Sequence, residues 1–117
     1  MDRQEKVVGR RKSDSGLLPG GASATSHKEK STVTLKDGSE VKILRRSFPF
    51  ANKDEAGLLF LCWVRDLSQY EAVKGKMVGN KRVGKDAIEA FYTTVAGGYY
   101  FAPPVPEDGF VGDVLVG

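Results

Sequence analysis

The clearest hydrophobic pattern in this sequence is the apolar run Gly57–Val64 (GLLFLCWV), which is bounded by polar residues on both sides. A continuous run of this length predicts a strand covered on both faces, or at least a central strand. β-Branched and aromatic residues predict two shorter strands before it, from about Val33 to Leu35 and from about Val41 to Ser47. The pair Asp37-Gly38 lies between these two strands and is a tight-turn signal.

The residues after the apolar run carry the spacing of an amphipathic helix. Asp66 stands at the N-cap position and Gln69 follows three residues later, which is a capping-box pattern. Apolar residues then recur at intervals of three, three and four, at Leu67, Tyr70, Val73 and Met77. This spacing predicts a helix with one apolar face. Gly75 weakens it by up to about 1 kcal/mol relative to alanine.

A second helix is expected after the loop Gly79–Gly84. Asp86 stands at its N-cap position and Glu89 completes another capping box. The apolar residues of this helix form one stripe, at Ala87, Ile88, Phe91, Tyr92 and Val95. Gly97-Gly98 is expected to end the helix, and Tyr99–Ala102 is predicted to be a short aromatic strand that ends at two prolines.

The order strand, strand, helix, helix, strand predicts an α+β fold with helices on one face of an antiparallel sheet. The compact domain is expected to span residues 32–104. Residues 1–31 are polar and are expected to be extended, because they cannot bury enough apolar surface to offset their ordering entropy unless they dock on something. Residues 105–117 are expected to form a flexible tail.

Composition and charge narrow the class of protein. The 117 residues are 40% hydrophobic and 28% charged, as in soluble globular domains. The net charge is +3, but Lys and Arg are too sparse for a nucleic-acid footprint, so we expect no nucleic-acid partner. Cys62 is the only cysteine and excludes an internal disulfide. No run is apolar and long enough for a membrane span and no secretion signal is recognisable, so we expect a cytoplasmic protein without a membrane partner.

Four stretches carry a resemblance to a known family. In chain order they are VVGRRKSD, SHKEKSTV, VKILRRSFPF with GLLFLCW after it, and DAIEAFYTTVAGGYYFAPP. Together they resemble the C-terminal half of dye-decolourising peroxidases, in particular the bacterial branch described as deferrochelatase or peroxidase. The resemblance implies half of a duplicated ferredoxin-like assembly. It also implies haem b as cofactor and a peroxidase activity that reduces hydrogen peroxide while a small dye- or porphyrin-like substrate is oxidised.

The resemblance implies a role for the only histidine of the chain. The family's axial haem ligand is a histidine in a loop ahead of an ILRR-type strand, and the matching residue here is His27. An imidazole suits ferric haem because it leaves the sixth position of the iron open for peroxide. Without the resemblance, a lone histidine in a Ser/Lys/Glu loop is interpreted as exposed and inert.

Asp86 matches the family carboxylate that accepts a hydrogen bond from the axial imidazole and raises the basicity of that ligand. The same residue forms a good N-cap pair with Glu89. One carboxylate is not expected to serve both roles fully, so the two interpretations stay open.

On the opposite side of the haem, the resemblance implies that Arg45 is the distal arginine, whose guanidinium stabilises charge developing on bound peroxide. Ser47 matches a small polar residue of the same pocket, and Phe60 and Leu59 are expected to line it and keep it dry. Without the resemblance, Arg45 is a surface charge on an edge strand, and the two apolar residues are ordinary core.

The sequence departs from the family at the distal aspartate, which in the family lies in an upstream Gly-rich GxxDG-type loop. Asp37-Gly38 and Asp108-Gly109 lack that context. We therefore expect the N-terminal half of the enzyme to be missing from this chain, and either that half or a homo-oligomer to be its partner. Three functions stay open: a haem peroxidase, a catalytically incomplete haem-binding fragment, and a cofactor-free interaction module.

The last residues, PEDGFVGDVLVG, mix glycines with spaced apolar side chains. Members of the resembled family that are packaged in encapsulin shells carry docking tails of this general texture. A frayed terminus or an extra edge strand is favoured over docking here, because chain ends are poorly ordered unless something holds them.

Overall fold

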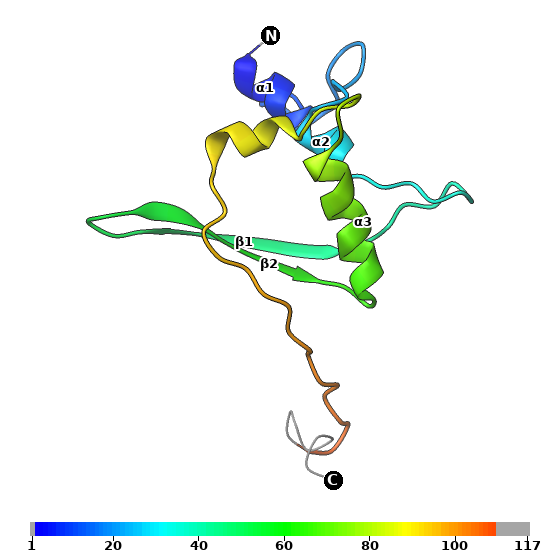
Figure 1. The fold of residues 1–117 in the computed structure, drawn as a ribbon, viewed down its shortest axis with the longest axis vertical. Coiled ribbons are helices and arrows are strands. Elements are labelled where there is room, and N and C mark those ends of the chain that lie inside the picture. Colours follow the sequence, from blue (N-terminus) through cyan, green and yellow to red (C-terminus); the bar gives the residue numbers. More distant parts are fainter. Residues whose placement is uncertain (1, 110–117) are drawn as a thin grey trace.

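The computed structural model describes residues 2–109. In chain order the elements are α1 (Arg3–Val8), α2 (His27–Lys30), β1 (Leu44–Ala51), β2 (Ala56–Trp63), α3 (Leu67–Val78) and the 3₁₀ helix η1 (Ala87–Phe91). α1, α2 and η1 gather near the C-terminal end of α3, and the β1–β2 hairpin lies at its other end (Figure 1). An antiparallel pair of strands combined with helices confirms the α+β class. Within residues 2–109, no helix has the length and apolar character that a membrane crossing requires.

The N-terminal segment contains two helices, although we expected residues 1–31 to be extended. α1 forms because Asp2 and Glu5 make a reciprocal capping box, and it ends at Gly9, whose φ of 87° favours glycine. The segment also supplies residues that are at most 6% exposed, namely Leu18, Ser26 and Lys30. Local capping and docking on the rest of the chain therefore order a segment of low apolar content.

β1 and β2 pair over 8 residues each in an antiparallel hairpin with continuous register. Asn52 closes the turn, because its Oδ1 accepts the backbone N–H groups of Asp54 and Glu55 at 2.8 and 2.9 Å. β2 lies one residue from the predicted bounds at each end. β1 begins three residues later than predicted and continues through Pro49, which an edge strand tolerates because the missing N–H faces away from the ladder.

Both faces of the hairpin are open within the described residues. Its large apolar side chains are 38–64% exposed: Leu44, Phe48, Phe50, Leu58, Leu59, Phe60, Leu61 and Trp63. The expectation of a covered or central strand is therefore wrong for residues 2–109, where β2 has β1 as its single hydrogen-bonded neighbour. A lone two-stranded hairpin is marginally stable in water, so this surface is suited to packing against further protein.

α3 begins as predicted. The Asp66 carboxylate accepts the N–H of Ser68 at 2.8 Å, and Gln69 Oε1 accepts the N–H of Asp66 at 3.2 Å, which confirms the capping box. Val73, at 3% exposure, is the most buried apolar residue among those described. The helix runs from the hairpin to α2 (Figure 1), so it links the two regions that carry the predicted site residues.

η1 is shorter than the helix predicted there. It ends at Phe91, because Tyr92 adopts an extended backbone with φ −145° and ψ 159°. Val95, which was expected on the apolar stripe, is 93% exposed. Amphipathic spacing stabilises a helix mainly through the surface that it packs against. Within the described chain α1 contacts η1, whereas Val95 at the far end of the stripe is left uncovered.

Two predicted strands are also absent from residues 2–109. In place of Val33–Leu35 there is an isolated bridge between Thr34 and Glu40, around the predicted turn. Tyr99 lies outside any strand and contacts α3, where its ring meets that of Tyr70 edge-on at 5.9 Å between centroids. Neither segment joins the β1–β2 sheet. The predicted tail extends to residue 117, and its residues 110–117 lie outside the described part of the chain.

Candidate functional site

The site lies where α2 meets the loop that precedes η1. Ser26 caps α2, because its Oγ accepts the N–H of Glu29 at 3.4 Å and its carbonyl accepts the N–H of Lys30 at 2.9 Å. His27 is therefore the first residue of a short helix, whereas the sequence analysis placed it in a loop. The cap fixes the backbone from which the imidazole projects.

His27 and Asp86 are joined by a hydrogen bond across 59 residues of sequence, with Nδ1 of His27 2.8 Å from Oδ2 of Asp86. The Asp86 side chain is fully buried, and the His27 side chain is 32% exposed. The second oxygen of Asp86, Oδ1, accepts the N–H of Ile88 at 3.0 Å and so caps η1. The expectation that one carboxylate could not serve both roles is wrong, because each role uses a different oxygen.

This hydrogen bond determines which nitrogen of the ring is free. An ionised carboxylate can only accept hydrogen bonds, so Nδ1 of His27 is the donor. In the neutral imidazole Nε2 then keeps its lone pair, which is the form that binds a metal ion. A carboxylate on Nδ1 also raises the basicity of Nε2. The pair thus provides one oriented nitrogen ligand.

A single imidazole fits haem, because the porphyrin supplies the other nitrogen donors and one axial histidine completes a peroxidase-type site. Among residues 2–109, no group of three or more His, Cys, Asp or Glu side chains is arranged to hold a metal ion. The chemistry of the donor set at His27 therefore agrees with the cofactor that the sequence analysis expected.

The loop that carries Asp86 is attached to both of its neighbours through the backbone. The N–H of Asp86 donates to the carbonyl of Met77 in α3 at 2.8 Å. The N–H of Ala87 donates to the carbonyl of Thr25, two residues before His27, also at 2.8 Å. These two bonds hold the backbone at Asp86 against both α3 and the segment that leads into α2.

Lys30 is a site residue that the sequence analysis missed. It is 1% exposed, and its Nζ donates to the carbonyl of Gly84 at 2.5 Å. The available signal was its position three residues after His27, which puts both side chains on one face if the segment is helical. The segment was interpreted as a loop, so the spacing was not used.

The hairpin places the predicted distal residues on two different faces. Ser47 pairs with Phe60 and Arg45 pairs with Cys62, and paired residues of an antiparallel ladder project to the same side. Arg45, Ser47 and Phe60 therefore share one face. Leu59 pairs with Phe48 and projects to the opposite face, because successive residues of a strand alternate. The geometry argues against Leu59 and Phe60 lining one pocket.

Cys62 shows the influence of Arg45 on this face. Burial raises the pKa of the Cys62 thiol, and the positive charge of Arg45 acts in the opposite direction. The thiol therefore stays protonated at neutral pH.

The structure does not bring Arg45 and His27 into contact. β2 leads into the N-terminal end of α3, and Arg45 pairs with a residue at that end of the hairpin. α2 instead contacts the C-terminal end of α3, where Lys76 Nζ donates to Glu29 Oε1 of α2 at 3.5 Å. The two predicted site residues thus lie toward opposite ends of a helix of 12 residues, about 18 Å in length.

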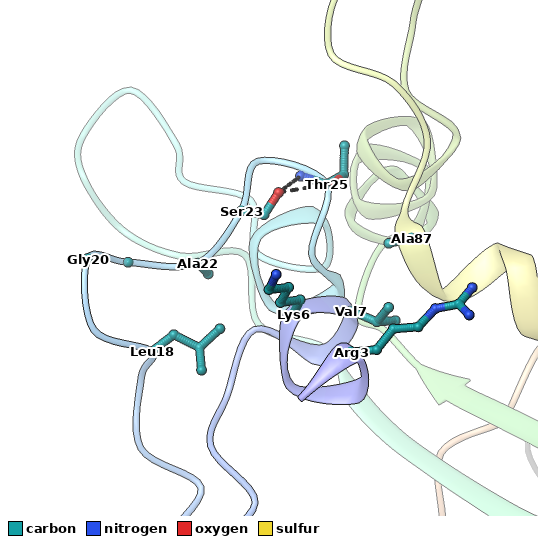
Figure 2. A pocket seen from close by; sticks show the side chains of 10 residues that line it. Arg3, Lys6, Val7, Leu18, Gly20, Ala22, Ser23, Thr25 and Ala87 are labelled. Carbon is teal, nitrogen blue, oxygen red and sulfur yellow. Dashed lines mark hydrogen bonds between the residues drawn. The ribbon is translucent and has the colours of Figure 1, made fainter. Parts of the chain in front are cut away.

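A hollow of about 480 Å³ lies behind the site, between α1 and the loop that leads to α2. Lys6 and Val7 border the hollow from α1, and Ala87 borders it from η1 (Figure 2). Neither His27 nor Arg45 lines it. It is separate from the imidazole and is no part of the candidate site.

The family comparison agrees with this arrangement. Residues 1–107 match the family described as Dyp-type peroxidase, C-terminal. The chain belongs to the Dyp-type peroxidases. The dye-decolorizing peroxidase of Mycobacterium tuberculosis is 35% identical over 109 residues, which cover 90% of this chain and 32% of that relative. The predicted family membership is confirmed, and the chain spans about a third of the length of this relative.

Solved structures of Dyp-type peroxidases have the same fold. The encapsulated DyP-type peroxidase of Mycobacterium smegmatis has a TM-score of 0.67 at 32% identity, and the match covers 75% of this chain and 30% of that one. A DypB variant of Rhodococcus jostii RHA1 in complex with haem has a TM-score of 0.66 at 27% identity, and the match covers 74% of this chain and 29% of that one.

Proposed function

We propose that this chain is the haem-ligating part of a Dyp-type peroxidase, with His27 as the axial ligand of haem b. The observation that carries the proposal is the 2.8 Å hydrogen bond from His27 Nδ1 to the buried Asp86 carboxylate. It leaves Nε2 as the free, basic nitrogen. A solved Dyp-type relative is a complex with haem, which supports the choice of cofactor.

When bound, the haem would supply the redox chemistry that reduces hydrogen peroxide and oxidises a dye- or porphyrin-like substrate. The residues of this chain have simpler tasks. His27 would hold the iron through Nε2. The Asp86 carboxylate accepts the hydrogen bond from Nδ1 of His27 and so fixes the orientation of the ring. Oδ1 of Asp86 anchors the carboxylate to η1 through the N–H of Ile88, so the acceptor stays in place.

Arg45 would act from the hairpin as a fixed positive charge near bound peroxide. A guanidinium stays protonated and can stabilise negative charge that develops in the transition state. Ser47 and Phe60 lie on the same face, where the hydroxyl can hydrogen-bond and the ring can exclude water. Leu59 has no part in this proposal because it lies on the other face.

Complete peroxidase activity would require the length of the family that this chain does not cover, about two thirds in the M. tuberculosis relative. Proton transfer by a positioned acid–base group contributes typically about 10² to 10⁴ in rate, and the sequence contains no match to the distal aspartate loop. The chain by itself is thus proposed to bind haem with little turnover. Turnover would appear when the remaining part is supplied by a partner or by a longer protein.

The test is a titration of the full chain with hemin, followed by the Soret absorbance, in parallel with His27→Ala. We expect a six- or five-coordinate histidine spectrum in the native chain and its loss in the variant. Lys28→Ala, which changes the next residue of α2, is the matched control and should bind hemin as the native chain does. An unchanged spectrum in His27→Ala would refute axial ligation by this residue.

Peroxide turnover distinguishes a peroxidase from a haem-binding fragment. The loaded chain is assayed with hydrogen peroxide and a phenolic dye, alone and after mixing with the upstream part of a Dyp-type peroxidase. Activity only in the mixture supports the proposal, and no hemin binding in either sample favours the cofactor-free interaction module.

A further inference from the structure

Lys30 and Asp86 are the two charged residues that are buried within the described chain. Lysine is almost never fully buried unless its amine is paired, yet Lys30 is 1% exposed. Its Nζ donates to the carbonyl of Gly84 at 2.5 Å. A buried ammonium without a hydrogen bond would destabilise the fold. The bond to the Gly84 carbonyl therefore allows a lysine to be buried at position 30.

Lys30 and His27 contact the same loop from the same helix. They are three residues apart in α2, so their side chains leave one face of it. His27 reaches Asp86, and Lys30 reaches Gly84, two residues earlier in the loop. α2 therefore holds the loop at two points, one of which is the imidazole itself.

The backbone hydrogen bonds around Asp86 do not hold the turn that precedes it, which the Lys30 side chain contacts. The N–H of Asp86 is held by Met77, and the following N–H, of Ala87, is held by Thr25. The residues before Asp86 turn sharply, with Gly84 at a φ of 72°. Lys30 is the side chain that ties this turn to α2.

We propose that Lys30 is a positioning residue for the axial imidazole, an inference that rests on the proposed function of His27. By holding the carbonyl of Gly84, its ammonium keeps the Asp86 carboxylate in reach of His27 Nδ1. A hydrogen bond with a charged donor is stronger than a neutral one, and Lys30 makes it in a buried site where water does not compete. A methionine of similar size would fill the space but could not donate.

The test reads the imidazole directly and does not need haem. His27 is the only histidine, so its ring nitrogens give single, unambiguous signals in ¹⁵N NMR spectra of the full chain. We expect the neutral ring of the native chain to carry its proton on Nδ1, and this proton to exchange slowly with water. Lys30→Met should raise the fraction with the proton on Nε2 and speed the exchange about tenfold or more, the factor for losing one hydrogen bond to a charged group.

Two further variants separate positioning from a general effect on stability. Lys30→Arg keeps a charged donor and should restore most of the Nδ1–H signal. Lys28→Met makes the same chemical change two residues earlier in α2, where no side-chain hydrogen bond is present in residues 2–109, and should leave the signal unchanged. A folded Lys30→Met chain with native His27 signals would overturn the proposal.

A measurement on the native chain covers the case in which Lys30→Met does not fold. The Lys30 ammonium should give a slowly exchanging NH₃⁺ signal with cross-relaxation to the residues around Gly84, and its absence would also overturn the proposal.

Hemin binding distinguishes a failure of the Lys30 proposal from a failure of the haem proposal. Native-like His27 signals in folded Lys30→Met, with hemin still bound through His27, would defeat the role of Lys30 alone. Altered His27 signals in a chain that never binds hemin would defeat the haem proposal alone.

Discussion

At the scale of single residues, the two oxygens of Asp86 hold different partners. Oδ2 accepts from the imidazole of His27, and Oδ1 accepts from the backbone of Ile88. The carboxylate is therefore anchored to a helix start while it orients a ring on another helix. Because the side chain is fully buried, water cannot replace either partner without a change in structure.

We predict that Asp86→Asn moves the proton of the neutral His27 ring from Nδ1 to Nε2. An amide can keep the helix cap with its oxygen, but its NH₂ group then faces Nδ1 and donates to it. The ring proton moves to Nε2, the nitrogen needed for iron, and hemin affinity should fall about 10- to 100-fold. Titration with hemin measures the loss. Asp66→Asn alters an equivalent cap on α3 that has no imidazole partner, and it should bind hemin normally.

We predict that Arg45→Leu leaves haem bound but slows the reaction with peroxide in a chain completed by the rest of a Dyp-type peroxidase. A charge that stabilises the transition state acts on rate more than on cofactor affinity, and loss of one such donor costs about 10² to 10³ in rate. Stopped-flow spectra of the loaded enzyme measure this. Arg46→Leu is the control, because Arg46 lies on the other face of β1. The variant could instead lose haem, while the molecules that keep it react with peroxide at the native rate. That result would mean that Arg45 contacts a haem propionate or stabilises the fold.

At the scale of elements, the loop between α3 and η1 sets the position of Asp86. It begins at Gly79, whose φ is 70° and where a Cβ would overlap the carbonyl of Gly84. Only glycine fits this close approach of two backbone segments. The same carbonyl accepts the Lys30 hydrogen bond, so the approach and the positioning of Asp86 are coupled.

We predict opposite effects of the same substitution at two glycines near the end of α3. Gly79→Ala should lower the free energy of unfolding by about 1–3 kcal/mol or more, because φ is positive and the Cβ has no room. Gly75→Ala, in the helix interior with nothing within 4 Å of its Cβ, should raise it by up to about 1 kcal/mol. Urea titrations give both values. Equal stabilities would contradict the close approach at Gly79.

At the scale of the whole molecule, the His27–Asp86 site is packed within the described chain, whereas the hairpin is exposed. The His27–Asp86 junction is closed by bonds from α2, α3 and η1. The hairpin exposes aromatic and aliphatic side chains on both faces. The chain as a whole spans about a third of the length of the M. tuberculosis relative. The polar site can thus form from this chain, whereas the apolar hairpin lacks a covering layer within residues 2–109.

We predict that the isolated chain associates with itself or binds an apolar fluorescent dye through the hairpin. Light scattering and dye fluorescence measure this, and both signals should fall when the upstream part of a Dyp-type peroxidase is added. Leu59→Ser removes apolar surface on the face away from Arg45 and should reduce association while leaving hemin binding intact. A monomeric native chain without dye binding would show that the hairpin is covered in solution.

The features that the sequence by itself determined are those governed by neighbouring residues. The start of α3 follows from Asp66 and Gln69, which are three residues apart and satisfy each other's backbone donors. The strand β2 follows from a run of apolar residues too short for a helix. Family membership likewise rests on short local stretches in a fixed order, and it was predicted correctly.

Only the tertiary structure decided the features that depend on distant partners. The hydrogen bond between His27 and Asp86 joins residues 59 positions apart. Local spacing does not predict which oxygen of Asp86 accepts from His27 and which from Ile88. The burial of Lys30 depends on the approach of the Gly84 carbonyl from 54 residues away. η1 ended at Phe91, short of the exposed Val95, and the faces of β2 stayed open within residues 2–109. Apolar spacing fixes an element only when a surface is there to pack against it.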